Sequence, residues 1–558
     1  MGSIDAKMQR WMACFIGWMS CLCVVTTAQA QQPLPRNDSV KIIYIIHADS
    51  LIGIQKADSD ITKLMGHVIL QQGNTLFSCD SAYKNNTTNV VDAYGHIHIN
   101  QADSVQAYGD YLHYLGNEKL AILSGHVRLQ DAQMTLFTEK LTYDLHQHVA
   151  QYLQGGKLVS QQTTLTSQSA TYYTDLHQAF FQHQVRLNDP QYTLRTDSLA
   201  YHTDTHTAYF IAPTLIHLQD SATVIHTHDG YYNTDLGEAM FASRSVITDS
   251  SQMTTADSLF YFRKKGLGVA RGNVIWRDTS RKVTVLAGYA ETHDQTSTLL
   301  ATQQPLLIYE MKNDTLYTVA DTLFSGIIPR KDTPNKGPLD PEKTALPDSA
   351  RQDSSAIRYF SAFHHVRIYS DSLQAVADSM YYSFADSTFR FYIQPVVWIG
   401  DYQLSGDTIY LLTEHQQAKE LQLIEHAIII NQIGKNMFNQ VKGRTIFGYF
   451  EDNRLNWMHV NGNAESVYYV QDDQGAFIGI NRVSCSVIDI YFKDQKVYRV
   501  AFRGEPSGSM SPLKGARLQD YLLRNFSWQV NRRPKSKTEL IPPSYSASAF
   551  LNGHENMP

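Results

Sequence analysis

The 558-residue sequence is poor in the features that mark disulfide-rich domains and membrane helices. It has five cysteines, and three of them, Cys14, Cys21 and Cys23, fall within one N-terminal apolar stretch. After residue 30 no apolar run reaches the roughly 20 residues that a membrane-spanning helix needs. These absences exclude a disulfide framework and a multi-helix membrane protein. The sequence leaves open whether the remaining Cys79 and Cys485 are bridged or are two separate thiols.

Signatures of catalysis and of metal binding are also missing. The sequence contains no Gly-x-Ser-x-Gly elbow, no His-Glu-x-x-His, no P-loop and no dinucleotide fingerprint. Three histidine pairs have i, i+2 spacing: His96/His98, His146/His148 and His226/His228. Because a metal site needs three or four ligands, we expect these imidazoles to be solvated. We therefore predict no enzyme, no catalytic residue, no metal and no cofactor.

The sequence also has no large excess of positive or negative charge, since the formal net charge is only −6. Proteins that bind nucleic acid usually carry a basic patch and a high isoelectric point, so we expect no nucleic-acid partner. What the sequence does have is 33 tyrosines, with many threonine, valine and isoleucine residues. Aromatic and β-branched residues favour half-buried strands.

The N-terminus has the layout of a secretory signal peptide. Lys7 and Arg10 precede an apolar stretch over 11–25, and Ala28-Gln29-Ala30 is a small-residue cleavage site. The sequence therefore predicts a signal peptide over residues 1–30 and an exported mature chain.

Two short patterns alternate along the rest of the chain. The first, Asp-small-apolar-x-Tyr, is found at Asp110–Tyr114, Asp197–Tyr201, Asp257–Tyr261 and Asp378–Tyr382. The second, Gly-x-Val-x-apolar, is found at Gly66–Leu70, Gly95–Ile99, Gly125–Leu129 and Gly272–Trp276, with degenerate copies at His183–Leu187 and His364–Ile368. Successive copies are 28 to 30 residues apart over the first half of the chain. This phased recurrence predicts roughly a dozen stacked repeats between residues 45 and 465.

Each repeat alternates apolar and polar residues with period two, which indicates β-strands. Residues i, i+2 and i+4 share a face of a strand, so the second pattern predicts one continuous apolar face. We expect this face to comprise Val68, Leu70, Ile97, Ile99, Val127, Leu129, Val185, Leu187, Val274, Trp276, Val366 and Ile368. The repeated glycine would allow a close backbone approach at the strand entrance, and the repeated aspartate suits a turn.

Composition divides the chain after the signal into four segments. Residues 41–329 and 357–510 are expected to form repeat arrays, separated by a proline-rich linker or loop at 330–356. Residues 484–503 are expected to form a closing hairpin around Lys493-Asp494-Gln495. Residues 511–558 are expected to form a tail with a short helix at 518–526 and disorder beyond Arg532.

The alternating units after a signal sequence resemble the OstA-like domain of periplasmic lipopolysaccharide-transport proteins, well over 41–329 and less well over 357–510. The resemblance implies an all-β fold, an elongated antiparallel β-jelly roll whose 29–30-residue repeats stack into a groove. It implies a non-enzymatic carrier, periplasmic and possibly associated with the outer membrane, that shields the acyl chains of lipopolysaccharide or a related glycolipid on the apolar face. It also implies edge-strand pairing with other jelly-roll transport proteins and with the outer-membrane assembly protein.

Two other functions stay open at this point. A carbohydrate-active β-solenoid enzyme would need a cluster of acidic or basic residues on one rung, which the sequence does not reveal. A structural or adhesive surface array would need no ligand at all. The apolar face itself could also be a core that its own side chains fill.

Overall fold

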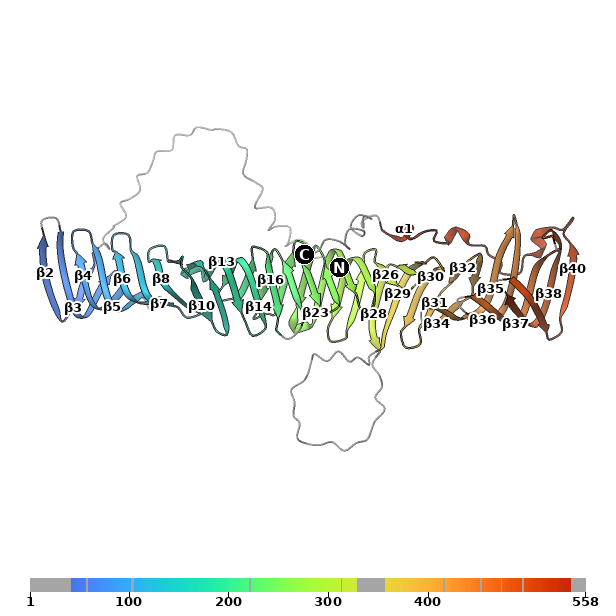
Figure 1. Ribbon diagram of the computed structural model, residues 1–558, viewed down its shortest axis with the longest axis horizontal. Coiled ribbons are helices and arrows are strands. Elements are labelled where there is room, and N and C mark those ends of the chain that lie inside the picture. Colours follow the sequence, from blue (N-terminus) through green and yellow to red (C-terminus); the bar gives the residue numbers. More distant parts are fainter. Residues whose placement is uncertain are drawn as a thin grey trace, which may run out of the picture.

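The computed structural model describes residues 42–542, except 57–58, 102–104, 220–221, 313, 329–356, 415–416, 452–453, 473 and 494–495. The expected signal peptide and the expected linker therefore lie outside the described residues. The described chain is an elongated roll of antiparallel strands joined in one hydrogen-bonded ladder (Figure 1). This is the all-β fold that the repeats predicted and the jelly-roll architecture that the OstA-like resemblance implied.

Strands near the N-terminus are mostly long and cross the whole width of the roll. They are β1 (Tyr44–His47), β2 (Ser50–Lys56), β3 (Ser59–Gln72), β4 (Thr75–Asn85), β5 (Val90–Gln101), β6 (Val105–Leu115), β7 (Leu120–Gln130) and β8 (Thr135–Asp144).

Strands in the middle of the chain are mostly half as long. Here many of the long strands are replaced by two short ones, which are separated at the point where a long strand would bend. They are β9 (Val149–Tyr152), β10 (Gly156–Ser160), β11 (Thr163–Ser167), β12 (Ser169–Tyr173), β13 (Gln178–Asn188), β14 (Tyr192–His202), β15 (Thr207–Phe210), β16 (Thr214–Leu218), β17 (Val224–Thr227), β18 (Gly230–Asn233), β19 (Glu238–Ala242), β20 (Val246–Asp249), β21 (Gln252–Thr255), β22 (Ser258–Phe262), β23 (Leu267–Asp278), β24 (Val283–His293), β25 (Thr298–Thr302), β26 (Leu306–Glu310), β27 (Thr315–Val319) and β28 (Thr322–Ile328).

The ladder continues across the gap at 329–356, since β28 pairs with β29 from Thr322 opposite Phe363 to Ile328 opposite Ile357. The remaining strands are β29 (Ile357–Tyr369), β30 (Gln374–Ser383), β31 (Thr388–Tyr392), β32 (Val396–Ile399), β33 (Tyr402–Ser405), β34 (Thr408–Glu414), β35 (Gln417–Gly434), β36 (Met437–Glu451), β37 (Arg454–Gln471), β38 (Phe477–Lys493), β39 (Lys496–Arg503) and β40 (Ser507–Pro512). The pairing of β38 with β39 is the closing hairpin expected at 484–503.

Helices are few and short among the described residues. They are the 3-10 turns η1 (Thr174–Leu176), η2 (Arg263–Lys265), η3 (Leu518–Tyr521) and η4 (Val530–Arg532), and one α-helical turn, α1 (Lys537–Leu540). In this described part of the chain no helix is long and apolar enough to cross a membrane.

Every long strand bends once, and the bend divides the sheet into two walls. In β3 the register shifts between Met65 and Val68, so residues 59–65 pair in one layer and residues 68–72 in another. We call the layer that contains Val68–Gln72 wall 1, the layer that contains Ile61–Met65 wall 2, and the line of bends the corner. The hydrophobic core lies between the two walls, on the inner side of the corner.

The repeated glycine lies at the corner. Gly66, Gly95, Gly125 and Gly272 have φ between +73° and +76°, a backbone conformation that residues with a Cβ seldom adopt. A Cβ built on Gly125 would lie 2.6 Å from Oδ2 of Asp110 on the neighbouring strand. Glycine is therefore required both by the backbone and by a close approach, as the sequence predicted.

The repeated aspartate also lies at the corner. Asp80, Asp110, Asp197 and Asp378 lie within strands, against the expected turn, whereas Asp257 lies in a bend between two strands, as expected. The residue after each glycine also has a positive φ. This conformation brings its side chain within hydrogen-bonding distance of the aspartate 16 to 18 residues earlier in the chain. The pairs are His67–Asp49 at 2.9 Å, His96–Asp80 at 2.7 Å and His126–Asp110 at 2.7 Å, from Nδ1 to Oδ2. Hydrogen bonding to the carboxylate raises the pKa of all three histidines. Asn273 takes the same place and donates to Asp257 at 2.8 Å.

The tail folds back over the outer face of wall 1 in the C-terminal half of the roll (Figure 1). Its side chains Leu522, Phe526 and Trp528 cover Ile428 and Phe438 on that face. The expected helix at 518–526 is only the 3-10 turn η3.

The expectation of disorder beyond Arg532 fails for residues 533–542. Arg533 donates to Oε1 of Gln374, and Arg367 forms an ion pair with Glu539. Composition missed this order because the tail's contacts come from strands more than 150 residues away. Residues 543–558 lie outside the described part of the chain.

Candidate functional site

The apolar face predicted from the repeats lies on the interior side of wall 1. Eleven of its twelve residues are at most 2 % exposed, and Trp276 is partly buried against the same core. Strand register aligns half of the set in one row: Leu70, Ile99, Leu129, Leu187, Trp276 and Ile368. The other half forms the adjacent row at the corner: Val68, Ile97, Val127, Val185, Val274 and Val366.

The first of these rows, which we call the inner row, runs through the ladder without a gap. Leu70 lies opposite Phe77, Phe77 opposite Ile99, and Ile99 opposite Ala107. The same succession of cross-strand neighbours continues to Val483 on β38. Three of its positions are polar, namely Thr254, Thr318 and Ser466. Stacked repeats thus align one apolar interior surface along nearly the whole described chain.

In the N-terminal third of the roll, wall 2 fills this interior. The hollow beside Leu70, Phe77 and Tyr114 measures about 10 Å³, and the one beside Leu136, Tyr152 and Phe181 measures about 0 Å³. A cavity needs at least about 10–15 Å³ to hold one water molecule. The inner row is therefore a closed core in this region.

Tyrosines of wall 2 close the edge of the roll that lies opposite the corner, which we call the mouth. Tyr114 donates to Gln72 and Tyr143 to Gln101, each across the gap to a wall 1 strand end. Tyr172 donates in the same way to Asp131, and Tyr232 donates to Gln191 at 3.0 Å. Burial raises the pKa of Tyr143 to about 12, so its hydroxyl remains a donor at neutral pH. These bridges link the two walls. The first three tyrosines are 29 residues apart, and the fourth follows after 60, because the hydroxyl of the intervening Tyr201 has no hydrogen-bond partner within the described residues.

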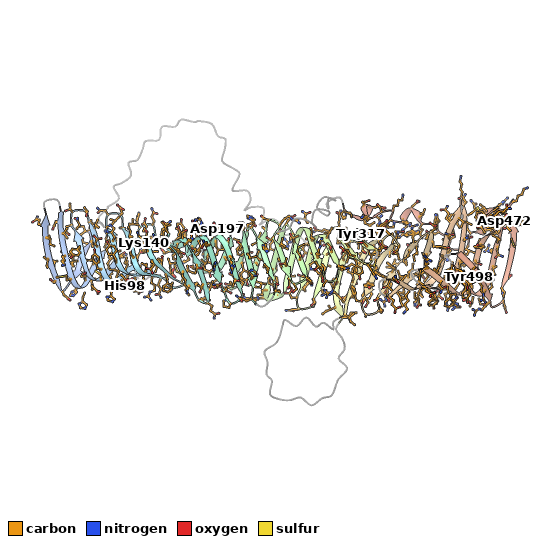
Figure 2. The ribbon with its side chains drawn as sticks, in the orientation of Figure 1. His98, Lys140, Asp197, Tyr317, Asp472 and Tyr498 are labelled. Atoms are coloured by element: carbon orange, nitrogen blue, oxygen red, sulfur yellow. The ribbon has the colours of Figure 1, made fainter. Side chains whose placement is uncertain are left out.

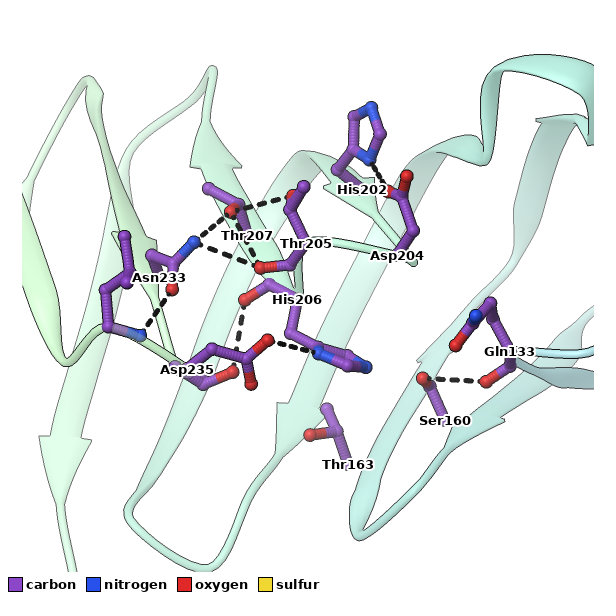
Figure 3. A network of polar contacts seen from close by, with 12 residues as sticks. Gln133, Ser160, Thr163, His202, Asp204, Thr205, His206, Thr207, Asn233 and Asp235 are labelled. Carbon is purple, nitrogen blue, oxygen red and sulfur yellow. Dashed lines mark hydrogen bonds and ion pairs between the residues drawn. The ribbon is translucent and has the colours of Figure 1, made fainter.

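Stacked turns reinforce wall 2 on its mouth side (Figure 3). His206 Nδ1 lies 2.8 Å from Oδ2 of Asp235 in the next turn along the roll. Asn233 donates to the carbonyl of Thr205 at 3.0 Å and to Oγ1 of Thr207 at 2.8 Å. These bonds hold successive repeats together. Nε2 of His206 is buried and has no hydrogen-bond partner within the described residues.

The interior opens in the middle of the roll. A cavity of about 80 Å³ lies between the walls, and its lining includes Trp276, Val285, Leu307, Leu316, Leu323 and Phe360. Just before this section, Tyr261 donates along wall 2 to Asp294 at 3.2 Å. Tyr317, labelled in Figure 2, faces outward from β27, while Leu316 and Thr318 face the cavity.

Two arginines reach this cavity from opposite walls. Arg281 stands in the wall 1 hairpin between β23 and β24, and Arg358 stands at the mouth end of β29 in wall 2. Arg281 donates to Oδ2 of Asp278 at 2.6 Å. Arg358 is half-buried and makes no ion pair with any residue that the structure describes. Burial, and next the charge of Arg281, lower the pKa of Arg358.

One further polar group of the lining has no partner. Thr318 is fully buried, and its Oγ1 has no hydrogen-bond partner within the described residues. A buried hydroxyl without a partner costs about 1–3 kcal/mol. Thr318 therefore marks the cavity as a place where a ligand oxygen would be stabilised.

Other sequence predictions concern groups away from this cavity. His98 stacks on Tyr108 on the outer face of wall 1, while His96 is paired at the corner. Among the described residues no cluster of three or more potential ligands could hold a metal ion. Cys79 on β4 and Cys485 on β38 are free thiols.

Sequence reasoning missed the mouth tyrosines, the two arginines and the tail. Among the tyrosines, Tyr114 carried a signal, since it ends a copy of the first repeat pattern. Arg281 and Arg358 carried none, because neither belongs to a repeated pattern and their walls meet only in three dimensions.

Comparison with known proteins agrees with the repeat pattern. The family model described as OstA-like protein matches residues 40–197 and 182–257. A solved structure of LptH from Pseudomonas aeruginosa, the LptA-homologous periplasmic component of a lipopolysaccharide transport device, is 21% identical. The alignment covers 19% of this chain and 78% of that chain, with a TM-score of 0.17. No curated protein matches the chain. Residues 40–257 are thus similar to the OstA-like family.

Proposed function

We propose that this protein is a non-enzymatic periplasmic carrier of lipopolysaccharide or a related glycolipid. The observation that carries the proposal is the unbroken inner row, which opens into an apolar cavity in the middle of the roll. Each methylene group that leaves water for such a surface contributes about 0.8 kcal/mol. The match to the OstA-like family supports a lipid, rather than a polysaccharide, as the cargo.

The cargo enters through the mouth. In the N-terminal third this requires the tyrosine bridges to open one after another, beginning with pairs such as Tyr143–Gln101. A single hydrogen bond contributes only about 0.5–1.5 kcal/mol net, so a bridge can yield where an acyl chain replaces the lost core contacts. The middle section already contains a cavity and is the resting position of the acyl chain.

The partners dock at the two ends of the roll. At the N-terminal end, edge strands β1 and β2 expose Tyr44, Ile46 and Leu51. At the C-terminal end, β39 and β40 expose Tyr498 and Met510. Edge strands present unpaired N–H and C=O groups that another strand can complete. Other jelly-roll transport proteins, including the outer-membrane assembly protein, add their strands here.

Depletion of the protein in its own cells tests the proposal. Newly made lipopolysaccharide is followed by separating inner from outer membranes. The expected result is that lipopolysaccharide accumulates at the inner membrane as the protein disappears, and that re-expression restores export. Unchanged lipopolysaccharide on the cell surface after full depletion would overturn the proposed function and favour a structural surface array.

A further inference from the structure

We propose that Arg281 and Arg358 form an anion clamp that holds the phosphate of a phosphorylated lipid while one acyl chain fills the central cavity. The inference rests on the proposed function and deepens it by naming the headgroup chemistry and the residues that select it.

The placement of the two arginines supports the clamp. Arg358 shares the interior face of β29 with Phe360, which lines the cavity, so its guanidinium stands at the mouth end of an apolar surface. Arg281 approaches from wall 1, in the hairpin directly before Val283 and Val285. A ligand whose charged end lies between the arginines therefore has its apolar end directed inward.

The charge balance at this place also favours an anion. Asp278 is fully buried and already accepts from Ser280 and Arg281, so it compensates one arginine. The second positive charge, on Arg358, forms no ion pair of its own among the described residues, and the carboxylate that acts on it is Asp278, which already pairs with Arg281. Like charges held together without a counter-ion repel each other, and a phosphate would neutralise the pair. Guanidinium groups bind phosphate in a bidentate geometry, which makes arginine better suited than lysine.

The unpartnered hydroxyl of Thr318 is a second, independent sign of a ligand. It lies in the lining of the same cavity, fully buried between Leu316 and Ala320 on the chain. A purely hydrocarbon occupant would leave it unsatisfied. A lipid oxygen near the chain, such as an ester carbonyl, would accept its hydrogen bond.

The clamp is tested with purified full chain and two probes that differ only in the phosphate. The probes are lysophosphatidic acid and monoacylglycerol with the same acyl chain, both used below their micellar concentrations. Binding is measured by displacement of an apolar fluorescent dye and by native mass spectrometry. The clamp predicts that lysophosphatidic acid binds more tightly than monoacylglycerol and that added salt reduces this difference in affinity. Inorganic phosphate alone should not displace the dye.

Variants then assign the effect to the two residues. R358Q and R281Q should each weaken lysophosphatidic acid binding about tenfold and leave monoacylglycerol unchanged. R358K should keep part of the affinity, and R186Q, an exposed arginine on the outer face of wall 1, should have no effect. L316W, which fills the cavity, should weaken both probes equally.

The possible failures point to different ideas. Equal binding of both probes, unaffected by R358Q and R281Q but lost in L316W, would overturn the clamp and leave the proposed lipid carrier intact. Binding of both probes that L316W does not change would overturn the central cavity as the acyl site. Correct folding of each variant is checked by its far-ultraviolet circular dichroism.

Discussion

At the scale of single residues, the corner of the roll explains most of the repeated sequence pattern. A glycine with positive φ lets the strand bend, and the following residue places a side chain on the aspartate of the neighbouring strand. The sequence could predict that the glycine was needed for conformation. It could not predict the histidine–aspartate contact, because the two residues belong to different strands and 16 residues separate His126 from Asp110.

Substitution of a corner glycine should therefore destabilise its repeat. G125A places a Cβ 2.6 Å from Oδ2 of Asp110. The alanine must also adopt the φ of +76° that Gly125 has. The left-handed conformation alone costs about 1–2 kcal/mol for a residue with a Cβ. We expect faster amide hydrogen exchange in β6 and β7, and a partial rescue in G125A/D110A, which removes the clash but not the backbone strain.

The matched control for this prediction is G53A on β2. A Cβ at Gly53 meets no atom within 4 Å, and its φ is not in the left-handed region. Exchange in G53A should stay at the level of the parent protein. If G125A exchanged no faster than G53A, the corner would not be a conformational requirement.

At the scale of elements, the tail acts as an extra layer on wall 1. It is held by glutamines that point outward from three strands. Gln403 on β33 and Gln440 on β36 bind its backbone, and Gln374 on β30 accepts from the side chain of Arg533. Gln403 donates to the carbonyl of Ser527 and accepts from the N–H of Gln529, both at 2.7 Å. The tail is therefore attached to wall 1 by side-chain hydrogen bonds and not by backbone pairing with a strand. Composition alone could not predict it, since the tail is rich in proline, serine and basic residues.

Loss of one glutamine should release the tail. Q403L leaves the carbonyl of Ser527 and the N–H of Gln529 without their side-chain partner, and each hydrogen bond lost contributes about 0.5–1.5 kcal/mol. We expect limited proteolysis to cut residues 513–532 several times faster in Q403L than in the parent. Q422L changes a glutamine on wall 2, away from the tail, and should leave the cleavage rate unchanged. Equal cleavage in both variants would show that apolar packing alone retains the tail.

At the scale of the whole molecule, the repeats predicted the stack of strands and the identity of the inner row. The period-two alternation fixed which residues face inward, because a one-residue slip would expose them all. It could not show whether the interior is open. Closure depends on side chains from wall 2, such as Tyr114 and Tyr143, which meet wall 1 only after folding. Whether wall 2 fills the interior or leaves a cavity is therefore a property of packing.

The most direct test of the account is photo-crosslinking from inside the roll in living cells. A photoreactive residue replaces Leu316 in the central cavity, and a matched one replaces Val127 in the closed N-terminal third. The account predicts strong capture of lipopolysaccharide at 316 and weaker capture at 127, where the tyrosine bridges must first open. No lipid captured at 316, in a protein that still crosslinks to its partners through its edge strands, would contradict it.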